Sequence, residues 1–259
     1  MKKILLTCRV TSRLLAFLSL STAIYLLWFS GLLLIWRLPR RRWQWRRLIV
    51  RAWARGTARI AQIKINLRGQ PPDYPFLLVS NHLTYADIIV YGTVLKAVFV
   101  GKSEISGWPV LGPLSRAAGT IFIRREHFQD IPRVMSLIKS SLEENYGLII
   151  FAEGGTSKGE SIAPLKPALL EPAVQMGFPV HYASITYRTP PGSPAASEAV
   201  CWWGDVDFVP HLLGLLALPG FEATVTFGAR PLLGTDRKAL ARDMWQAMSA
   251  EFIPVDREV

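Results

Sequence analysis

The chain has 259 residues, about half of them hydrophobic, and its 30 Lys and Arg against 19 Asp and Glu give a formal net charge of +11. This apolar fraction excludes a disordered chain, the two cysteines exclude a disulfide scaffold, and the lack of periodic glycine excludes a collagen-like fibre. Residues 1–72 hold 15 basic side chains and no acidic one, whereas the remaining 187 residues have a net charge of −4. We therefore expect a basic N-terminal segment beside a mildly acidic domain, and no nucleic acid as a partner.

The first predicted element is a helix from Leu14 to Trp36, where 23 residues in a row carry no charge. Such a helix is about 34 Å long, slightly more than the hydrocarbon core of a bilayer. A cleaved signal peptide and a buried core helix are the alternatives, but the run is long, has arginines at both ends and lacks a small-residue cleavage site. We expect a retained membrane segment, which either spans the bilayer or forms a hairpin that enters one leaflet.

A second helix is expected after this segment, because arginines recur there every four residues while tryptophan and isoleucine fall near the other side. The arginines are Arg47, Arg51, Arg55 and Arg59, and the apolar residues are Trp45, Ile49, Trp53 and Ile60. At a membrane surface, the guanidinium groups would meet lipid phosphates and the indoles would lie at headgroup depth. Nine arginines from Arg37 to Arg59 follow the apolar run and four basic residues precede it, so the positive-inside rule predicts a domain on the cytoplasmic side of a bacterial inner membrane.

The N-terminal anchor is predicted to cover residues 1–72 and the main domain residues 73–259. Short β-rich apolar runs alternate in the main domain with helical stretches. The predicted strands are residues 76–80, 97–100, 120–123, 148–151, 179–185, 199–203 and 223–227, and the predicted helices include residues 129–145 and 235–252, the latter with Thr235 as its N-cap. This alternation predicts an α/β fold with a mixed, largely parallel sheet flanked by helices, in which ligands bind beyond the carboxyl ends of strands.

The loop after the strand at 76–80 contains His82 and Asp87. A histidine just past a strand end can point into a cleft, and a carboxylate five residues later can orient its imidazole and stabilise the protonated form, as a general base requires. In the alternative interpretation, Thr84 and Asp87 form an N-terminal cap of the next helix and His82 is an ordinary loop residue. Taken alone, these residues leave both interpretations open.

Two further loops carry polar residues after predicted strands. Arg124 and Arg125 follow the strand at 120–123, where a planar guanidinium could hold a phosphate or the pair could be a solvated strand end. The glycine-rich run 153–159 follows the strand at 148–151, and its glycines allow backbone N–H groups to face a phosphate or an oxyanion, or form a plain turn.

Residues 155–159 read G-T-S-K-G and formally match the nucleophile elbow of serine hydrolases. Ser157 would be the nucleophile, and the other members of the triad would be Asp205 or Asp207, and His211. The match is poor, because two residues separate the motif from the strand and the last two triad members would be only a few residues apart.

Taken in order, N-H-x-x-x-x-D at 81–87, G-T-I-F-I-R-R at 119–125 and F-x-E-G at 151–154 resemble the phospholipid/glycerol acyltransferase family, which includes the lysophosphatidic acid acyltransferases. The resemblance implies transfer of a fatty acyl group from an acyl thioester, acyl-CoA or acyl carrier protein, to the free hydroxyl of a lysolipid at the bilayer. The simplest acceptor is 1-acyl-sn-glycerol-3-phosphate, which would give phosphatidic acid. The implied chemistry uses no metal, no cofactor and no serine or cysteine nucleophile, and the two cysteines, Cys8 and Cys201, are expected to be free thiols.

The resemblance also implies residue roles. His82 would be the general base, and Asp87 would orient it. The residues that would bind the acceptor are Lys102, Arg124, Arg125, Glu153, Gly154, Gly155 and Thr156, with the arginines on its phosphate.

The third motif departs from the family pattern. Where the family commonly has F-P-E-G-T-R-S, residues 151–157 read F-A-E-G-G-T-S, so the arginine that would support a phosphate-bearing acceptor is missing, although Lys158 could compensate. Together with the run from Trp202 to His211, this departure is similar to bacterial members that acylate lyso-ornithine lipid. Lyso-ornithine lipid is therefore the alternative acceptor, and the alternatives of other classes are a membrane-anchored serine hydrolase and a lipid-binding protein without turnover.

Overall fold

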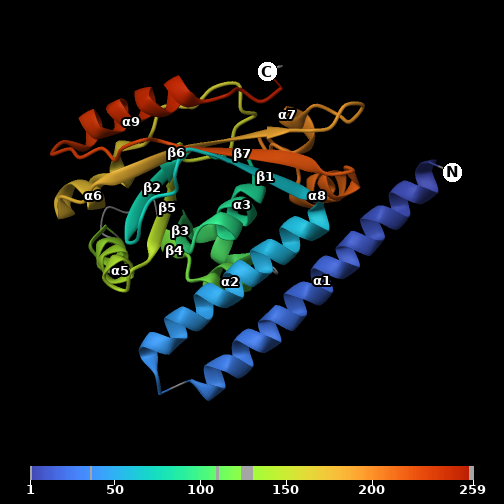
Figure 1. Ribbon diagram of the computed structural model, residues 1–259, viewed down its shortest axis with the longest axis horizontal. Coiled ribbons are helices and arrows are strands. Elements are labelled where there is room, and N and C mark those ends of the chain that lie inside the picture. The colour runs from blue at the N-terminus through green and yellow to red at the C-terminus, as the bar shows by residue number, and fades with distance from the viewer. Residues whose placement is uncertain (1, 36, 109–110, 124–130, 257–259) are drawn as a thin grey trace.

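The computed structural model describes residues 2–35, 37–108, 111–123 and 131–256. These residues form a seven-stranded sheet with helices on both faces and a hairpin of two long helices along one side (Figure 1). The predicted α/β fold with an N-terminal helical segment is confirmed.

The strand order in the sheet is β1-β7-β6-β2-β5-β3-β4. The strands are β1 (Ile63–Arg68), β2 (Phe76–Ser80), β3 (Ala97–Lys102), β4 (Ile121–Ile123), β5 (Gly147–Phe151), β6 (Val180–Arg188) and β7 (Phe221–Phe227). Neighbouring strands are parallel except β6 and β7, so β1 and β7 run opposite to the other five. The carboxyl ends of β2, β4 and β5 therefore lie at one edge of the sheet, where the three predicted functional loops begin.

The central strands are buried on both faces, as expected of parallel strands that helices cover on each side. Side chains alternate between two apolar cores: Phe76 and Leu78 belong to one, and Leu77 and Val79 to the other. The first core is covered by α3 (Ala86–Val94) and α8 (Phe208–Ala217), and the second by α5 (Ile131–Glu143), α6 (Glu171–Met176) and α9 (Arg237–Glu251). The shorter helices are α4 (Leu111–Ala118), α7 (Ala196–Ala199) and the 3₁₀ turns η1 (Ser103–Gly107) and η3 (Pro167–Leu169).

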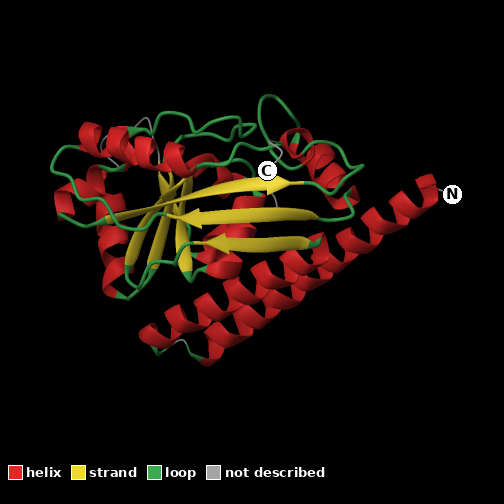
Figure 2. Ribbon diagram, turned by 45° about the horizontal axis from the view of Figure 1, so that its top comes forward, coloured by secondary structure: helices red, strands yellow, loops and turns green. Residues whose placement is uncertain are grey.

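The N-terminal hairpin consists of α1 (Lys2–Leu34) and α2 (Pro39–Ala61), which lie side by side in both ribbon views (Figures 1 and 2). The segment Ile4–Leu34 is long and apolar enough to cross a membrane, and only 6% of its most apolar window is buried. The alternative of a buried core helix is therefore wrong. The indole of Trp53 donates to Ser21 Oγ at 3.1 Å and that of Trp45 to the carbonyl of Trp28 at 3.4 Å. These two indoles hold α2 against α1, and their depth at a membrane surface stays a prediction.

The arginine stripe of α2 lies partly against the main domain. The guanidinium of Arg47 lies over the ring of Tyr146, 4.6 Å from its centroid, and over the ring of Tyr74 at 5.7 Å. The reason is that α2 packs against the main domain: Gly92 of α3 allows the methyl group of Ala54 to approach closely. One arginine of the stripe therefore stacks on the domain, whereas Arg55 and Arg59 are exposed.

Three local predictions are corrected. Residues 199–203 do not form a strand, because the amide of Cys201 closes the end of α7 by donating to Ala196. The strand β1 was not predicted, and it pairs with β7 although it lies before residue 72. The N-cap of α9 is Asp236 and not Thr235, since the Asp236 carboxylate accepts from the amide of Ala239 at 2.7 Å.

Candidate active site

In the loop that carries His82, the side chain of Asn81 continues the hydrogen bonding of β2 to β6. The last paired residue of β2 is Ser80, opposite Ala183 of β6. Beyond it, the amide group of Asn81 donates to the carbonyl of Ile185 at 3.0 Å and accepts from the amide of Ile185 at 2.7 Å. Asn81 therefore extends the β2–β6 ladder by one step, and this fixes the backbone position from which His82 projects.

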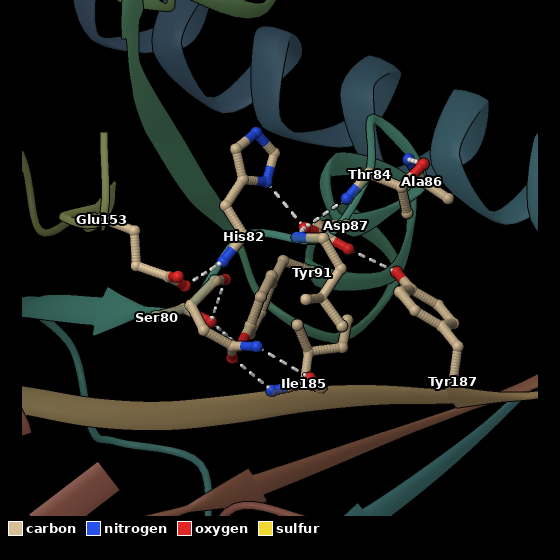
Figure 3. Close-up of polar contacts among 11 residues, drawn as sticks. Ser80, His82, Thr84, Ala86, Asp87, Tyr91, Glu153, Ile185 and Tyr187 are labelled. Carbon is tan, nitrogen blue, oxygen red and sulfur yellow. Dashed lines mark hydrogen bonds and ion pairs between the residues drawn. The ribbon is translucent and has the colours of Figure 1, made fainter. Parts of the chain in front are cut away.

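The carboxylate of Asp87 is fully buried in the first turn of α3. Its Oδ2 accepts from Nδ1 of His82 at 2.6 Å, and from the amides of Leu83 at 2.8 Å and Thr84 at 3.2 Å (Figure 3). Its Oδ1 accepts from the hydroxyl of Tyr187 at 2.6 Å. Asp87 thus has both of the roles that the sequence left open for its carboxylate, because it binds backbone amides ahead of the helix and holds the histidine as well.

The imidazole of His82 is oriented by two contacts. Nδ1 faces Asp87, and the ring lies on the ring of Phe151 at the end of β5, with centroids 4.1 Å apart and planes at 14°. Because a carboxylate only accepts, the neutral imidazole carries its proton on Nδ1 and its lone pair on Nε2. Nε2 points away from Asp87 (Figure 3), and 22% of the His82 side chain is exposed. The ring can therefore accept a proton from a molecule that approaches this edge of the sheet.

Glu153 supports the same loop from the end of β5. Its Oε1 accepts from the amide of His82 at 2.8 Å, and its Oε2 accepts from the amide of Ala163 at 3.1 Å. Burial raises the pKa of this carboxyl to about 7, against the opposing effect of the two backbone hydrogen bonds. Both oxygens bind the protein's own backbone, so the geometry accounts for Glu153 as a support of His82, and its contact with an acceptor stays a prediction.

The rest of the glycine-rich loop runs beside His82. The amide of Ser157 donates to the carbonyl of His82 at 3.1 Å. Gly154 has a positive φ of 87°, a backbone conformation in which a Cβ is strained. Gly155 is exposed and Thr156 is half-buried. These residues lie where acceptor-binding residues were predicted, and their contacts with an acceptor remain predictions.

The serine-hydrolase triad does not assemble within the described residues. Ser157 Oγ is buried and has no hydrogen-bond partner there. His211 instead pairs with the hydroxyl of Tyr85 at 3.0 Å and with the carbonyl of Cys201 at 3.0 Å. Asp205 and Asp207 are exposed. The match of residues 155–159 to the nucleophile elbow is therefore a coincidence of sequence.

The predicted phosphate-binding residues are placed only in part. The backbone of Lys102 lies at the carboxyl end of β3, in register with Ile123 of β4, and so at the same sheet edge as the His82 loop. Arg124 and Arg125 lie outside the described residues. Their roles stay predictions.

Three contributors to the site were missed in the sequence. The hydroxyl of Tyr187 on Asp87, the ring of Phe151 under His82 and the side-chain ladder of Asn81 each depend on a contact between distant segments. Asn81 stands beside His82 in the motif, and this adjacency was the one available signal. Nothing in the local sequence marks Tyr187, which lies 100 residues after its partner.

The chain matches a family model described as Acyltransferase over residues 62–186. It is 33% identical over 213 residues to a lyso-ornithine lipid O-acyltransferase of Brucella abortus, covering 77% of this chain and 80% of the relative. It is also 33% identical over 178 residues to a 1-acyl-sn-glycerol-3-phosphate acyltransferase of Neisseria gonorrhoeae, covering 67% and 69%. The crystal structure of the 1-acyl-sn-glycerophosphate acyltransferase of Thermotoga maritima shares the fold, with a TM-score of 0.63, 18% identity and 95% of each chain covered. The chain therefore belongs to the lysophosphatidic acid acyltransferase family and is an O-acyltransferase.

Proposed function

We propose that this enzyme transfers a fatty acyl group from an acyl thioester to the free hydroxyl of a lysolipid, with His82 as general base. The observation that carries the proposal is the orientation of His82: Nδ1 is bound to Asp87 at 2.6 Å and Nε2 is directed away from it. A base held in this way has its lone pair in a fixed direction before the substrate arrives.

The proposed reaction uses that geometry. The acceptor hydroxyl donates a hydrogen bond to Nε2 of His82, and its oxygen attacks the carbonyl carbon of the thioester. The hydroxyl proton passes to Nε2, and Asp87 stabilises the imidazolium that forms. The tetrahedral intermediate then expels the thiolate, which takes the proton from Nε2, so that one ester and one thiol leave and His82 is again neutral.

We propose lyso-ornithine lipid as the acceptor and 1-acyl-sn-glycerol-3-phosphate as the second candidate. The relatives from Brucella abortus and Pseudomonas aeruginosa, both named lyso-ornithine lipid O-acyltransferase, cover 77% and 78% of this chain, more than the 67% covered by the Neisseria gonorrhoeae relative. The third motif also lacks the arginine that would support a phosphate, with Gly155-Thr156 in its place. Both observations favour an acceptor that needs no such phosphate contact.

An aromatic cluster beside the catalytic loop supports a lipid substrate. The ring of Tyr85 contacts those of Trp202 and Phe208, with centroids 5.9 Å and 5.1 Å apart. Trp108 packs against the same two rings, and the amide of Trp202 donates to the carbonyl of Leu83 at 2.8 Å. These half-buried rings offer an apolar wall next to His82, as an acyl chain requires.

For membrane attachment, we propose that the hairpin of α1 and α2 enters one leaflet on the cytoplasmic side of the inner membrane. Arg13 donates to the carbonyls of Leu216 and Leu218, and Arg9 to that of Ala217, at the end of α8. Both ends of the hairpin therefore meet the main domain, which favours a hairpin over a helix whose N-terminus lies across the membrane. Apolar side chains exposed on α1 include Leu15, Leu18, Leu26, Leu27, Phe29 and Leu33.

The proposal is tested with the full chain purified in detergent and incubated with acyl-CoA or acyl carrier protein and a panel of lysolipids. Products are identified by mass spectrometry for the wild type, His82→Ala, Ser157→Ala and the control His181→Ala on β6. We expect a diacyl product that falls at least about a hundredfold in His82→Ala and persists in the other two variants. Unaltered activity of His82→Ala would refute the mechanism, and a product from the phosphate-bearing lysolipid alone would refute the proposed acceptor.

A further inference from the structure

Tyr187 joins the catalytic loop to the centre of the sheet. It projects from β6, is 2% exposed, and its hydroxyl donates to Oδ1 of Asp87 at 2.6 Å. The other oxygen of that carboxylate binds Nδ1 of His82. Asp87 therefore receives a hydrogen bond from the sheet on one oxygen and holds the catalytic ring with the other (Figure 3).

The phenol of Tyr187 is a permanent donor. Burial, followed by the nearby negative charge of Asp87, raises its pKa well above 10, so the hydroxyl keeps its proton at any pH at which the enzyme works. A donor on Oδ1 withdraws negative charge from Oδ2, which faces the imidazole. The strength of this one hydrogen bond therefore affects how strongly Asp87 stabilises the protonated ring.

The other ionisable groups around the pair do not bind Oδ1 in the described part of the chain. Tyr91 of α3 hydrogen-bonds to Ser80 Oγ at 2.6 Å. The thiol of Cys201, after α7, has its pKa raised by burial and by the charge of Asp87, and Glu153 binds backbone amides. Among these neighbours, Tyr187 is the group placed to modulate Asp87 directly.

We infer that Tyr187 is a positioning residue for acyl transfer, which acts through Asp87 on the orientation and the basicity of His82. This inference rests on the proposed role of His82 as general base. Strand β6 would then have two contacts with the catalytic loop: Ile185 hydrogen-bonds to Asn81, and Tyr187 hydrogen-bonds to Asp87.

The test compares Tyr187→Phe with Tyr91→Phe, which removes an equally buried hydroxyl that does not touch Asp87. We expect Tyr187→Phe to lower kcat about tenfold with KM unchanged, since one charge-assisted hydrogen bond is lost. The acid limb of kcat/KM should also move to higher pH, because more charge on Asp87 favours the imidazolium. Tyr91→Phe should keep the wild-type acid limb and kcat.

A second variant tests the same contact without removing it. Replacing Tyr187 by 3-fluorotyrosine keeps the shape and makes the phenol a stronger donor, so the acid limb should move to lower pH, opposite to Tyr187→Phe. Wild-type kcat and acid limb in Tyr187→Phe, or equal changes in Tyr91→Phe, would overturn the inference. His82→Ala is measured in parallel: if it stays active, the proposed function fails, whereas an inactive His82→Ala beside an unaffected Tyr187→Phe rejects the inference alone.

Discussion

The imidazole of His82 is stacked on the ring of Phe151, with centroids 4.1 Å apart. The hydrogen bond to Asp87 fixes the direction of Nδ1 in the ring plane, and the stack fixes the tilt of that plane. The two contacts come from different elements, one from α3 and one from the end of β5. Together they set the direction in which Nε2 points.

Phe151→Leu is expected to lower kcat about tenfold, because a tilted ring misplaces Nε2 while the hydrogen bond to Asp87 remains. The matched control is Phe99→Leu on β3, whose ring lies 6.2 Å from that of Phe151. Phe99→Leu should lose similar stability and keep kcat. Steady-state kinetics with thermal unfolding separates the two effects, and equal kcat values for both variants would contradict the role of the stack.

Asp87→Asn is expected to lower kcat by about a hundredfold or more. All four partners of the carboxylate are donors, so an amide, which presents its own N–H on one side, leaves at least one of them without an acceptor. A control is Asp207→Asn, an exposed residue whose side chain does not cap α8. Activity of Asp87→Asn equal to that control would contradict the assignment.

Glu153 predicts a pH dependence of stability. Its pKa is about 7 in the folded protein against an ordinary glutamate value of 4.5, so the folded state binds more protons than the unfolded state between these values. Stability therefore falls as pH rises through this window, by a Glu153 contribution on the order of 3 kcal/mol. Thermal unfolding from pH 4 to 8 should show this fall in the wild type and in Glu160→Gln, an exposed control, and a flatter profile in Glu153→Gln. Parallel profiles in all three proteins would be evidence against the assignment.

Arg13→Leu is expected to loosen the start of α1. The guanidinium donates to the carbonyls of Leu216, Leu218 and Pro219, which lie at the end of α8 and would lose this partner. Hydrogen exchange followed by mass spectrometry should show faster exchange in α1 and the end of α8, and no such change in Arg55→Leu on the exposed side of α2. Unchanged exchange in α1 would mean that this contact does not hold the hairpin to the domain.

Most of the fold could be predicted because strands buried on both faces leave a local signature. The runs FLLVS and GLIIF are continuous apolar segments ahead of polar loops, and both are strands at those positions. The strand Ile63–Arg68 was missed because its lysine and arginine had been counted with the basic anchor, and only its pairing with β7 identifies it. The run 199–203 has a strand-like composition, but its backbone bonds to α7 and to the His82 loop.

Only the part of the site that lies within one short stretch of sequence could be predicted. The spacing of His82 and Asp87 indicated a pair, and the structure brings the two side chains together at 2.6 Å. From the sequence alone, Asp87 could be assigned either as a cap of α3 or as the partner of His82. Its carboxylate has both roles in the structure, so a choice between the two could not succeed. The contact of Tyr187 with Asp87 could not be predicted, since a single tyrosine on a strand indicates only that the strand packs well.

Asn81 limits how far the motif can be transplanted. A side chain that both donates to and accepts from one backbone residue must carry an N–H and a carbonyl at the same distance; aspartate lacks the donor, and glutamine is longer by one methylene group. Residues 81–87 grafted onto another scaffold would include His82 and Asp87. They would lack the segment of β6 at Ile185 to which the side chain of Asn81 hydrogen-bonds. A designer would have to include a segment of β6 with the loop, so the smallest unit of this candidate site that could be transferred is discontinuous in sequence.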